Sequence, residues 1–132
     1  MSPQLTHEDV ALAAERVVAA YAAMDQDVYF DSFDPQATFI FHGTPERLTS
    51  REDYQEQWRS WVSEGWRVIS CHSSDPFIQI HGTTAVFSHS VTTVIEEQGQ
   101  RATTAERETI VFTRAGSGGV VAVHEHLSLN SF

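Results

Sequence analysis

Apolar residues recur every three to four positions in the first quarter of the chain, and this spacing predicts helices. Thr6 can cap a first helix, and Asp9 three residues later completes a short capping box. The apolar stripe behind this cap consists of Val10, Ala14, Val17, Val18, Tyr21 and Met24. Asp25–Phe33 can form a short second helix, which ends before Asp34-Pro35 because the residue preceding a proline avoids the helical region.

A short strand and a third helix are expected next. Ala37–Phe41 has the pattern of a strand, and the turn-forming residues from His42 to Pro45 end it. Ser50 can cap the third helix, and Gly65 is a natural terminator. Its apolar stripe consists of Tyr54, Trp58, Trp61 and Val62.

From Trp66 onward the apolar period changes to two, which predicts strands. Separators rich in Gly, Ser and Pro divide this half into Trp66–His72, Phe77–His81, Thr84–Ile95, Arg101–Arg114 and Val120–Ser128. Two of these separators are typical of hairpin loops. Helices followed by an antiparallel meander predict an α+β domain. We expect a curved sheet shaped as a half-cone, with the helices packed on its concave face and a pocket enclosed between them.

Length and composition indicate one domain that spans residues 1–132. Hydrophobic residues make up 41% of the chain, no apolar run is long enough to cross a membrane, and no leader is recognisable, so a cytoplasmic location is expected. Cys71 is the only cysteine, which excludes an intramolecular disulfide.

The charged residues narrow the chemistry. The formal net charge of -10 disfavours binding to nucleic acids and to anionic membranes. All eight cationic side chains are arginines, so Schiff-base and lysine-base chemistry is excluded. No phosphate-binding loop, dinucleotide-binding glycine pattern or serine triad is present, and no cofactor is expected. The closing strand offers two histidines without a recognisable third ligand, so no metal site is expected either.

Three segments together carry a resemblance to a known superfamily. They are Ala37–Gly43 with Thr49–Tyr54, Glu106–Phe112, which contains an arginine-x-threonine strand, and Val123–Ser128, which contains a histidine-x-histidine-x-serine strand. In this order the chain resembles the nuclear transport factor 2-like superfamily, and within it the SnoaL-like, ketosteroid-isomerase-like group. It is also similar to the association domain of calcium/calmodulin-dependent kinase II. The acidic residues near the second helix do not match the catalytic set of the steroid isomerases, so steroid isomerisation is not supported.

Three residues are candidates for catalysis. Arg107 shares a strand face with small and apolar residues, so it is either a cavity cation for an anionic ligand group or a surface arginine paired with a glutamate. Glu125 is the polar member of an apolar strand face, where it can act as a general base or form a structural ion pair, for instance with Arg107. His89 lies on an apolar face, either as a hydrogen-bonded core residue or as a proton carrier in the cavity.

The two faces of the closing strand predict which side chains enter the cavity. We expect Val121, Val123 and Leu127 to point inward, and His124 and His126 to point away. Ile110 and Phe112 lie opposite Arg107 on their strand, which would leave them exposed on the convex face. A homodimer through that face is therefore expected.

Aromatic residues and one histidine are candidates for the ligand-binding wall. His42 follows the first strand, either at the cavity mouth or as a loop residue before Pro45. Tyr21 alone among the chosen aromatics carries a hydroxyl that can donate to an oxyanion. The aromatic candidates, which serve as core, as ligand wall or as both, are Tyr21, Phe39, Phe41, Trp58 and Trp61.

Three functions remain open on this basis. The first is a SnoaL-like protein that binds a small organic ligand in an aromatic-lined cavity, with no catalytic activity assigned. The second is a cofactor-independent isomerase, dehydratase or cyclase with acid–base residues in the cavity. The third is a self-association module. A cavity that holds two hydrogen-bonding titratable groups would favour the second over the first.

Overall fold

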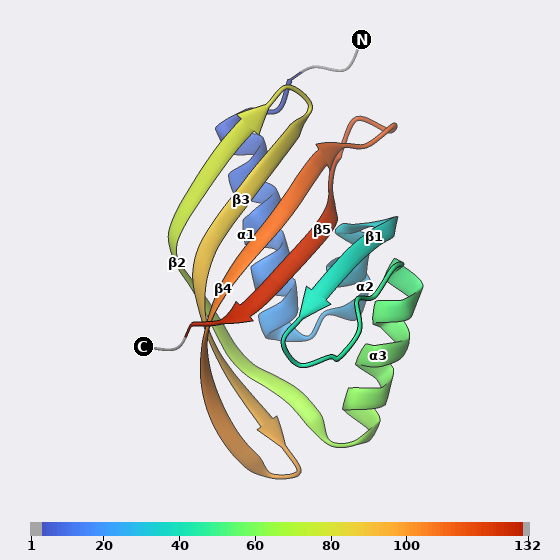
Figure 1. Ribbon diagram of the computed structural model, residues 1–132, viewed down its shortest axis with the longest axis vertical. Coiled ribbons are helices and arrows are strands. Elements are labelled where there is room, and N and C mark those ends of the chain that lie inside the picture. The colour runs from blue at the N-terminus through green and yellow to red at the C-terminus, as the bar shows by residue number, and fades with distance from the viewer. Residues whose placement is uncertain (1–3, 131–132) are drawn as a thin grey trace.

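The computed structural model describes residues 4–130, and a curved, open five-stranded sheet dominates it (Figure 1). The spatial order of the strands is β1-β5-β4-β3-β2. Strands β2 to β5 form an antiparallel meander, and β1 pairs in parallel with β5 at one edge. The strand bounds are Phe33–Phe41 for β1, Trp66–His81 for β2, Thr84–Glu97 for β3, Gln100–Arg114 for β4 and Val120–Leu129 for β5. The predicted α+β class, with a curved sheet and helices against it, is confirmed.

Three helices accompany the sheet: α1 (His7–Ala23), α2 (Gln26–Asp31) and α3 (Arg51–Ser63). The predicted capping box is present, because the Thr6 hydroxyl accepts from the backbone N–H of Asp9 at 3.1 Å and the Asp9 carboxylate accepts from the N–H of Thr6 at 3.0 Å. The Ser50 hydroxyl caps α3 by accepting from the backbone N–H of Asp53 at 3.0 Å. Helix α1 lies along the sheet next to β2, and α3 lies beside β1 (Figure 1).

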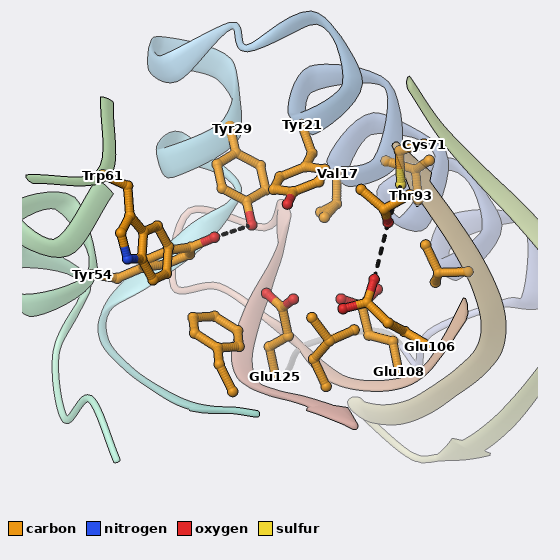
Figure 2. Close-up of a pocket in the computed structure, with 14 residues that line it drawn as sticks. Val17, Tyr21, Tyr29, Tyr54, Trp61, Cys71, Thr93, Glu106, Glu108 and Glu125 are labelled. Atoms are coloured by element: carbon orange, nitrogen blue, oxygen red, sulfur yellow. Dashed lines mark hydrogen bonds between the residues drawn. The ribbon is translucent and has the colours of Figure 1, made fainter. Parts of the chain in front are cut away.

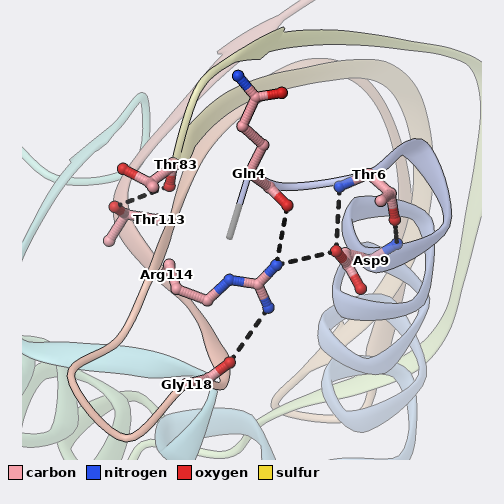
Figure 3. Close-up of polar contacts among 7 residues, drawn as sticks. All are labelled: Gln4, Thr6, Asp9, Thr83, Thr113, Arg114 and Gly118. Carbon is pink, nitrogen blue, oxygen red and sulfur yellow. Dashed lines mark hydrogen bonds and ion pairs between the residues drawn. The ribbon is translucent and has the colours of Figure 1, made fainter. Parts of the chain in front are cut away.

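Arg114, the last residue of β4, joins the start of α1 to the connection between β4 and β5 (Figure 3). Its guanidinium donates to the backbone carbonyl of Gln4 at 3.2 Å, to the carboxylate of Asp9 at 3.1 Å and to the carbonyl of Gly118 at 3.1 Å. Hydrogen bonds from Thr6, followed by the interaction with Arg114, lower the pKa of Asp9. The N-terminal cap and the β4–β5 connection are thereby held together by one side chain.

Two strands extend further than the sequence pattern predicts. Strand β1 begins at Phe33 and includes Pro35, and β2 continues through the predicted separator from Ser73 to Pro76. The pairing register shifts beside both prolines instead of ending there. Both strands lie at edges of the sheet, where the missing N–H of a proline costs no ladder hydrogen bond. A bulge thus replaces each predicted break, and α2 is correspondingly shorter than predicted.

A bulge in β5 corrects part of the prediction for its faces. Ala122 pairs with Phe112 and His124 pairs with Val111, so Val123 is an extra residue in the ladder. Ala122 is therefore fully buried, while Val121, predicted to point inward, lies on the convex side with its partner Thr113. Beyond the bulge the alternation continues as predicted, with residues 125 and 127 on the concave side.

The two faces of β4 are exchanged relative to the prediction. Ile110 and Phe112 are 0% and 1% exposed within the core of the chain, and Arg107 lies on the exposed, convex side. Ile110 and Phe112 bury far more apolar area than the small residues of the other face. Because alternate residues of a strand share a face, burying these two side chains places Arg107 on the opposite, convex face. The dimer was expected because Ile110 and Phe112 would be exposed on the convex face. Since both are buried within the chain, this reason for a dimer does not hold.

Candidate cavity site

A cavity lies between the concave face of the sheet and the three helices. Its inner part has a volume of about 70 Å³. It adjoins an outer pocket of about 400 Å³ beside the β1–α3 connection and the β3–β4 hairpin. Six residues line both parts: Tyr21, Phe41, Trp61, Thr93, Glu106 and Leu127. The inner part alone has room for a few water molecules, and together with the outer pocket it reaches the size range of small-molecule sites.

Three glutamate side chains meet in the inner cavity (Figure 2). Glu106 and Glu108 lie two residues apart on β4, so they point to the same concave face as Ile110 and Phe112. Glu125 comes from the neighbouring strand β5 and is directly opposite Ile110 in the ladder. The burial of β4's large apolar residues therefore also carries two carboxyl groups into the cavity.

Glu106 is held at the boundary between the inner cavity and the outer pocket. His42 Nε2 donates to one of its carboxylate oxygens at 2.6 Å, and the Thr93 hydroxyl donates to the other at 3.0 Å. The side chain of His42 is 31% exposed, whereas that of Glu106 is 8% exposed. His42 thus lies at the cavity mouth, one of the two positions that its sequence context allowed.

Glu108 is part of a buried chain of three polar groups. His89 Nε2 donates to Glu108 Oε1 at 2.7 Å, and His89 Nδ1 lies 2.6 Å from the hydroxyl of Ser73. Burial alone would raise the pKa of Glu108, but hydrogen bonds from Glu125 and His89, together with the charge of His89, lower it below the ordinary value. An ionised Glu108 is the result.

The pKa of Glu125 is shifted in the opposite direction. Burial raises its pKa well above the ordinary value, and the nearby charge of Glu108 raises it further. The residue is 3% exposed, and its Oε1 atom has no hydrogen-bond partner within residues 4–130. The cavity therefore combines a carboxylic acid that keeps its proton with a carboxylate that has lost its own.

Aromatic rings form much of the remaining cavity wall, four of them from the helices and one, Phe41, from β1 beside β5. Tyr21, Phe41 and Trp61, all predicted for this wall, line the cavity, together with Tyr29 and Tyr54. The hydroxyls of Tyr29 and Tyr54 are 2.8 Å apart, so one donates to the other (Figure 2). Burial raises the pKa of Tyr21, which keeps its hydroxyl protonated and able to donate.

Other predicted site residues lie elsewhere. Phe39 and Trp58 are fully buried and pack within the aromatic core, without contributing to the cavity lining. Arg107, predicted as a cavity cation, is exposed on the convex face, because β4 buries its other face, which carries Ile110 and Phe112. Within residues 4–130, none of the arginines lines the inner cavity or the outer pocket.

Sequence reasoning missed Glu106 and Glu108 because it compared the two faces of β4 by their small residues. The signal that identifies them is the pair Ile110 and Phe112, because these large apolar residues lie on the same face of β4 as Glu106 and Glu108. Glu125 and Leu127 line the cavity on the predicted face. His124 and His126 belong to neither the inner nor the outer lining, and His124 instead lies within 2.8 Å of the hydroxyl of Thr38.

Two further observations limit the chemistry of the described residues. In residues 4–130, no group of three or more His, Cys, Asp and Glu side chains is arranged to hold a metal ion. Over the same residues, every helix is too short or too polar to cross a membrane.

Comparison with known proteins gives one family match. The model of the SnoaL-like domain matches residues 10–131, which is nearly the whole chain. A search of curated proteins finds no match.

Solved structures with the same fold cover almost all of the chain. A nuclear transport factor 2-like protein of unknown function in nutrient uptake from Rhodospirillum rubrum is 22% identical, with 93% of this chain and 99% of that chain covered and a TM-score of 0.81. A putative calcium/calmodulin-dependent kinase II association domain from Exiguobacterium sibiricum is 14% identical, with coverages of 100% and 98% and a TM-score of 0.80. A ketosteroid isomerase-like protein from Erwinia carotovora is 14% identical, with coverages of 97% and 100% and a TM-score of 0.79. At these identities the likeness concerns the fold.

Proposed function

The chain belongs to the SnoaL-like domain family, and from the side chains in its cavity we propose that it is a small enzyme that catalyses proton transfer on an organic molecule without a cofactor. The carrying observation is that Glu108 and Glu125 meet in one buried cavity with different partners: His89 Nε2 donates to Glu108 at 2.7 Å, whereas Glu125 Oε1 has no hydrogen-bond partner within residues 4–130. The pKa shifts, lowered for Glu108 and raised for Glu125, agree with this difference. A pair of titratable groups separated in this way supplies an acid and a base at the same pH.

The two glutamates take different roles in this proposal. Glu125 keeps its proton at neutral pH and acts as the general acid toward a developing oxyanion. Glu108 is ionised and acts as the general base, while the hydrogen bond from His89 fixes its orientation. Tyr21 can donate a second hydrogen bond to the oxyanion. The reaction class is an isomerisation, a dehydration or a cyclisation.

The test is a proton-exchange screen. Small carbonyl compounds with acidic α-hydrogens are incubated with the protein in deuterated water, and deuterium uptake and double-bond migration are followed by NMR. The wild type is expected to accelerate at least one compound. Glu108→Gln and Glu125→Gln are each expected to lower that rate by about 100-fold or more, because a positioned acid or base contributes at least this factor. Glu56→Gln, on the exposed side of α3, is the matched control.

Two results would contradict the proposal that this protein is an enzyme. One is a rate unchanged by Glu125→Gln, since the acid would then have no role. The other is tight binding of panel members with no exchange above the uncatalysed rate. That second result would favour the alternative of a ligand-binding protein, in which the carboxyl groups only orient the bound molecule.

We also infer a homodimer through the convex face of the sheet, now on different grounds. Val86 and Val111 are direct ladder partners on that face, and the next row contains Thr84, Thr113 and Val121. A strip of β-branched side chains at the centre of a sheet favours a flat, apolar contact. The similarity to a putative kinase association domain supports self-association as well.

Sedimentation velocity at micromolar concentration tests this assembly. The wild type is expected to sediment as a dimer. Val111→Glu should convert it to a monomer, because it places a charge at the centre of the contact. Thr103→Glu, near the exposed end of the same strand face, is the control and should leave the dimer intact. A monomeric wild type would contradict the inference.

A further inference from the structure

Within residues 4–130, the acidic and basic side chains that line the cavity are glutamates, with the exception of His42 at the mouth, which donates to Glu106 at 2.6 Å. Glu106, Glu108 and Glu125 line the inner part, and Glu64 and Glu97 lie in the lining of the outer pocket. Among the described residues no arginine lines either part, and the sequence has no lysine. A cleft lined by charges of one sign, with apolar walls, concentrates ligands of the opposite sign.

One atom inside the cavity lacks the partner that burial demands. Glu125 Oε1 is buried and has no hydrogen bond within the described part of the chain. Once Glu125 is ionised, its oxygens only accept hydrogen bonds, so the partner that Oε1 then requires is a donor. Glu106 differs, because His42 and Thr93 already donate to its two oxygens. The bound group that best completes the cavity therefore presents N–H or O–H toward Glu125.

The opposite wall is suited to a positive charge. Tyr21, Tyr54 and Trp61 face the carboxyl groups across the cavity (Figure 2). The face of an aromatic ring attracts a cation, most strongly where water is excluded. An apolar skeleton attached to the cation would extend along Phe41 and Leu127, which line both the inner and the outer part.

We propose that the cavity binds a small organic cation, an amine on an apolar skeleton, whose ammonium N–H groups point to Glu125 Oε1 and whose charge is balanced by the surrounding glutamates. This inference concerns the same cavity and goes beyond the proposed function, because an ammonium ion that displaces the proton of Glu125 is bound as a ligand, whereas general acid catalysis by Glu125 applies to neutral substrates. A carboxylate or phosphate ligand would meet like charges, since His42 already donates to Glu106 and His89 to Glu108, and this costs binding energy. A neutral alcohol could donate to Glu125 but would gain nothing from the acidic lining.

Three molecules of nearly equal size separate these cases: benzylamine as the cation, benzyl alcohol as the neutral analogue and benzoate as the anion. Isothermal titration calorimetry near pH 7 compares their affinities for the wild type. Benzylamine is expected to bind at least tenfold more tightly than benzyl alcohol, and benzoate is expected not to bind. Glu125→Gln should lower the affinity for benzylamine at least tenfold, while Glu56→Gln should leave it unchanged.

Proton release provides a second readout that a non-specific surface contact would not produce. The titratable side chains that face Glu125 are Glu106 and Glu108 from β4, Tyr21 from α1, Tyr29 from α2, Tyr54 from α3 and Cys71 from β2. Burial raises the pKa of the three tyrosines and raises that of Cys71 to about 11, so these four groups stay protonated at neutral pH. Benzylamine should then expel the proton of Glu125, seen as a dependence of the binding heat on the ionisation enthalpy of the buffer. Benzyl alcohol should release none.

The outcomes are distinct from those of the exchange screen. Equal binding of benzylamine and benzyl alcohol, binding of benzoate, or benzylamine binding that is unaffected by Glu125→Gln would overturn the cation proposal. Glutamine preserves the size of the side chain, and Glu106→Gln provides a second variant, expected to weaken benzylamine as well, if Glu125→Gln proves unfolded by circular dichroism. Because binding is measured without turnover, the cation proposal can hold where the enzyme fails, and the enzyme can hold on neutral substrates where the cation proposal fails.

Discussion

Glu125 is a carboxyl group that is almost completely removed from water, with 3% of the residue exposed. It lies in an apolar and acidic surrounding, with Glu108 beside it, and none of the arginines of residues 4–130 lines the inner cavity. Its side chain lowers the stability of the fold where the carboxyl group would otherwise ionise, because burial opposes ionisation. Such a cost in stability is common where a group is positioned for function.

The pH dependence of stability follows from this shift. Since the pKa of Glu125 is higher in the folded than in the unfolded state, the native protein holds a proton that the unfolded chain loses above about pH 4.3. Its contribution to the free energy of unfolding thus falls as the pH rises through that window. Glu125→Gln lacks this loss, so its stability relative to the wild type is expected to increase by up to about 1.4 kcal/mol per pH unit between pH 5 and pH 7.

Urea unfolding at several pH values measures this difference. Glu108 contributes in the opposite sense, because its lowered pKa stabilises the fold above the unfolded value and loses this effect as the pH falls through the folded value. The range from pH 5 to pH 7 lies above that window and isolates Glu125. Glu56→Gln should give a constant difference, and a constant difference for Glu125→Gln as well would show that Glu125 is ionised in the folded protein.

Among the elements, β4 and β5 decide the composition of the cavity. Strand β4 buries Ile110 and Phe112, and the same alternation aims Glu106 and Glu108 inward. The bulge at Val123 allows β5 to bury Ala122 on one side of it and Glu125 on the other, although the two are three residues apart. A regular strand would place them on opposite faces.

Helix α1 supplies a prediction at the same scale. Its capping box and Arg114 tie the N-terminal turn to the sheet (Figure 3). Thr6→Ala removes the hydroxyl that accepts from the N–H of Asp9 and is expected to destabilise the protein by about 1 kcal/mol, the usual effect of losing such a cap. Thermal or urea unfolding measures this loss. Thr6→Ser, which keeps the hydroxyl, is the control and should recover most of the stability, whereas equal effects of both changes would mean that the cap contributes through packing alone.

At the scale of the whole molecule, the excess of acidic residues acts on the folded state. Eighteen Asp and Glu residues face eight Arg residues, with a formal net charge of -10. Compact states of high net charge repel themselves, and salt screens this repulsion over about 10 Å at 0.1 M. The acidic cavity lies within this field, which adds to the local preference for cations.

The melting temperature is therefore expected to rise as sodium chloride increases from about 10 mM to about 300 mM at pH 7. Differential scanning fluorimetry measures the shift, and sodium sulfate at equal ionic strength separates screening from a general salt effect on hydrophobic burial. A falling melting temperature would mean that attractive pairs such as Arg114 with Asp9 outweigh the net repulsion.

Much of the fold follows from the sequence, because local rules determine it. The capping box at Thr6, the helical stripes and the strand alternation after Trp66 depend on neighbouring residues, and the structure retains them. The hairpin turn at Gln98-Gly99 is likewise local, with φ values of 51° and 83° that suit a tight turn between twisted strands. The face of β5 beyond residue 123 was also predictable, since Glu125 and Leu127 keep the expected alternation.

Only the tertiary structure decided which face of β4 enters the cavity and what the cavity contains. Alternation defines two faces but not their direction, and direction depends on how much apolar area each face buries against the helices. Arg107 was therefore assigned to the wrong side, and Glu106 and Glu108 were missed. Proline at a sheet edge and the extra residue Val123 also depend on partners distant in sequence. The pKa shifts of Glu108 and Glu125 arise from burial and proximity, which exist only once β4 and β5 are paired under the aromatic wall.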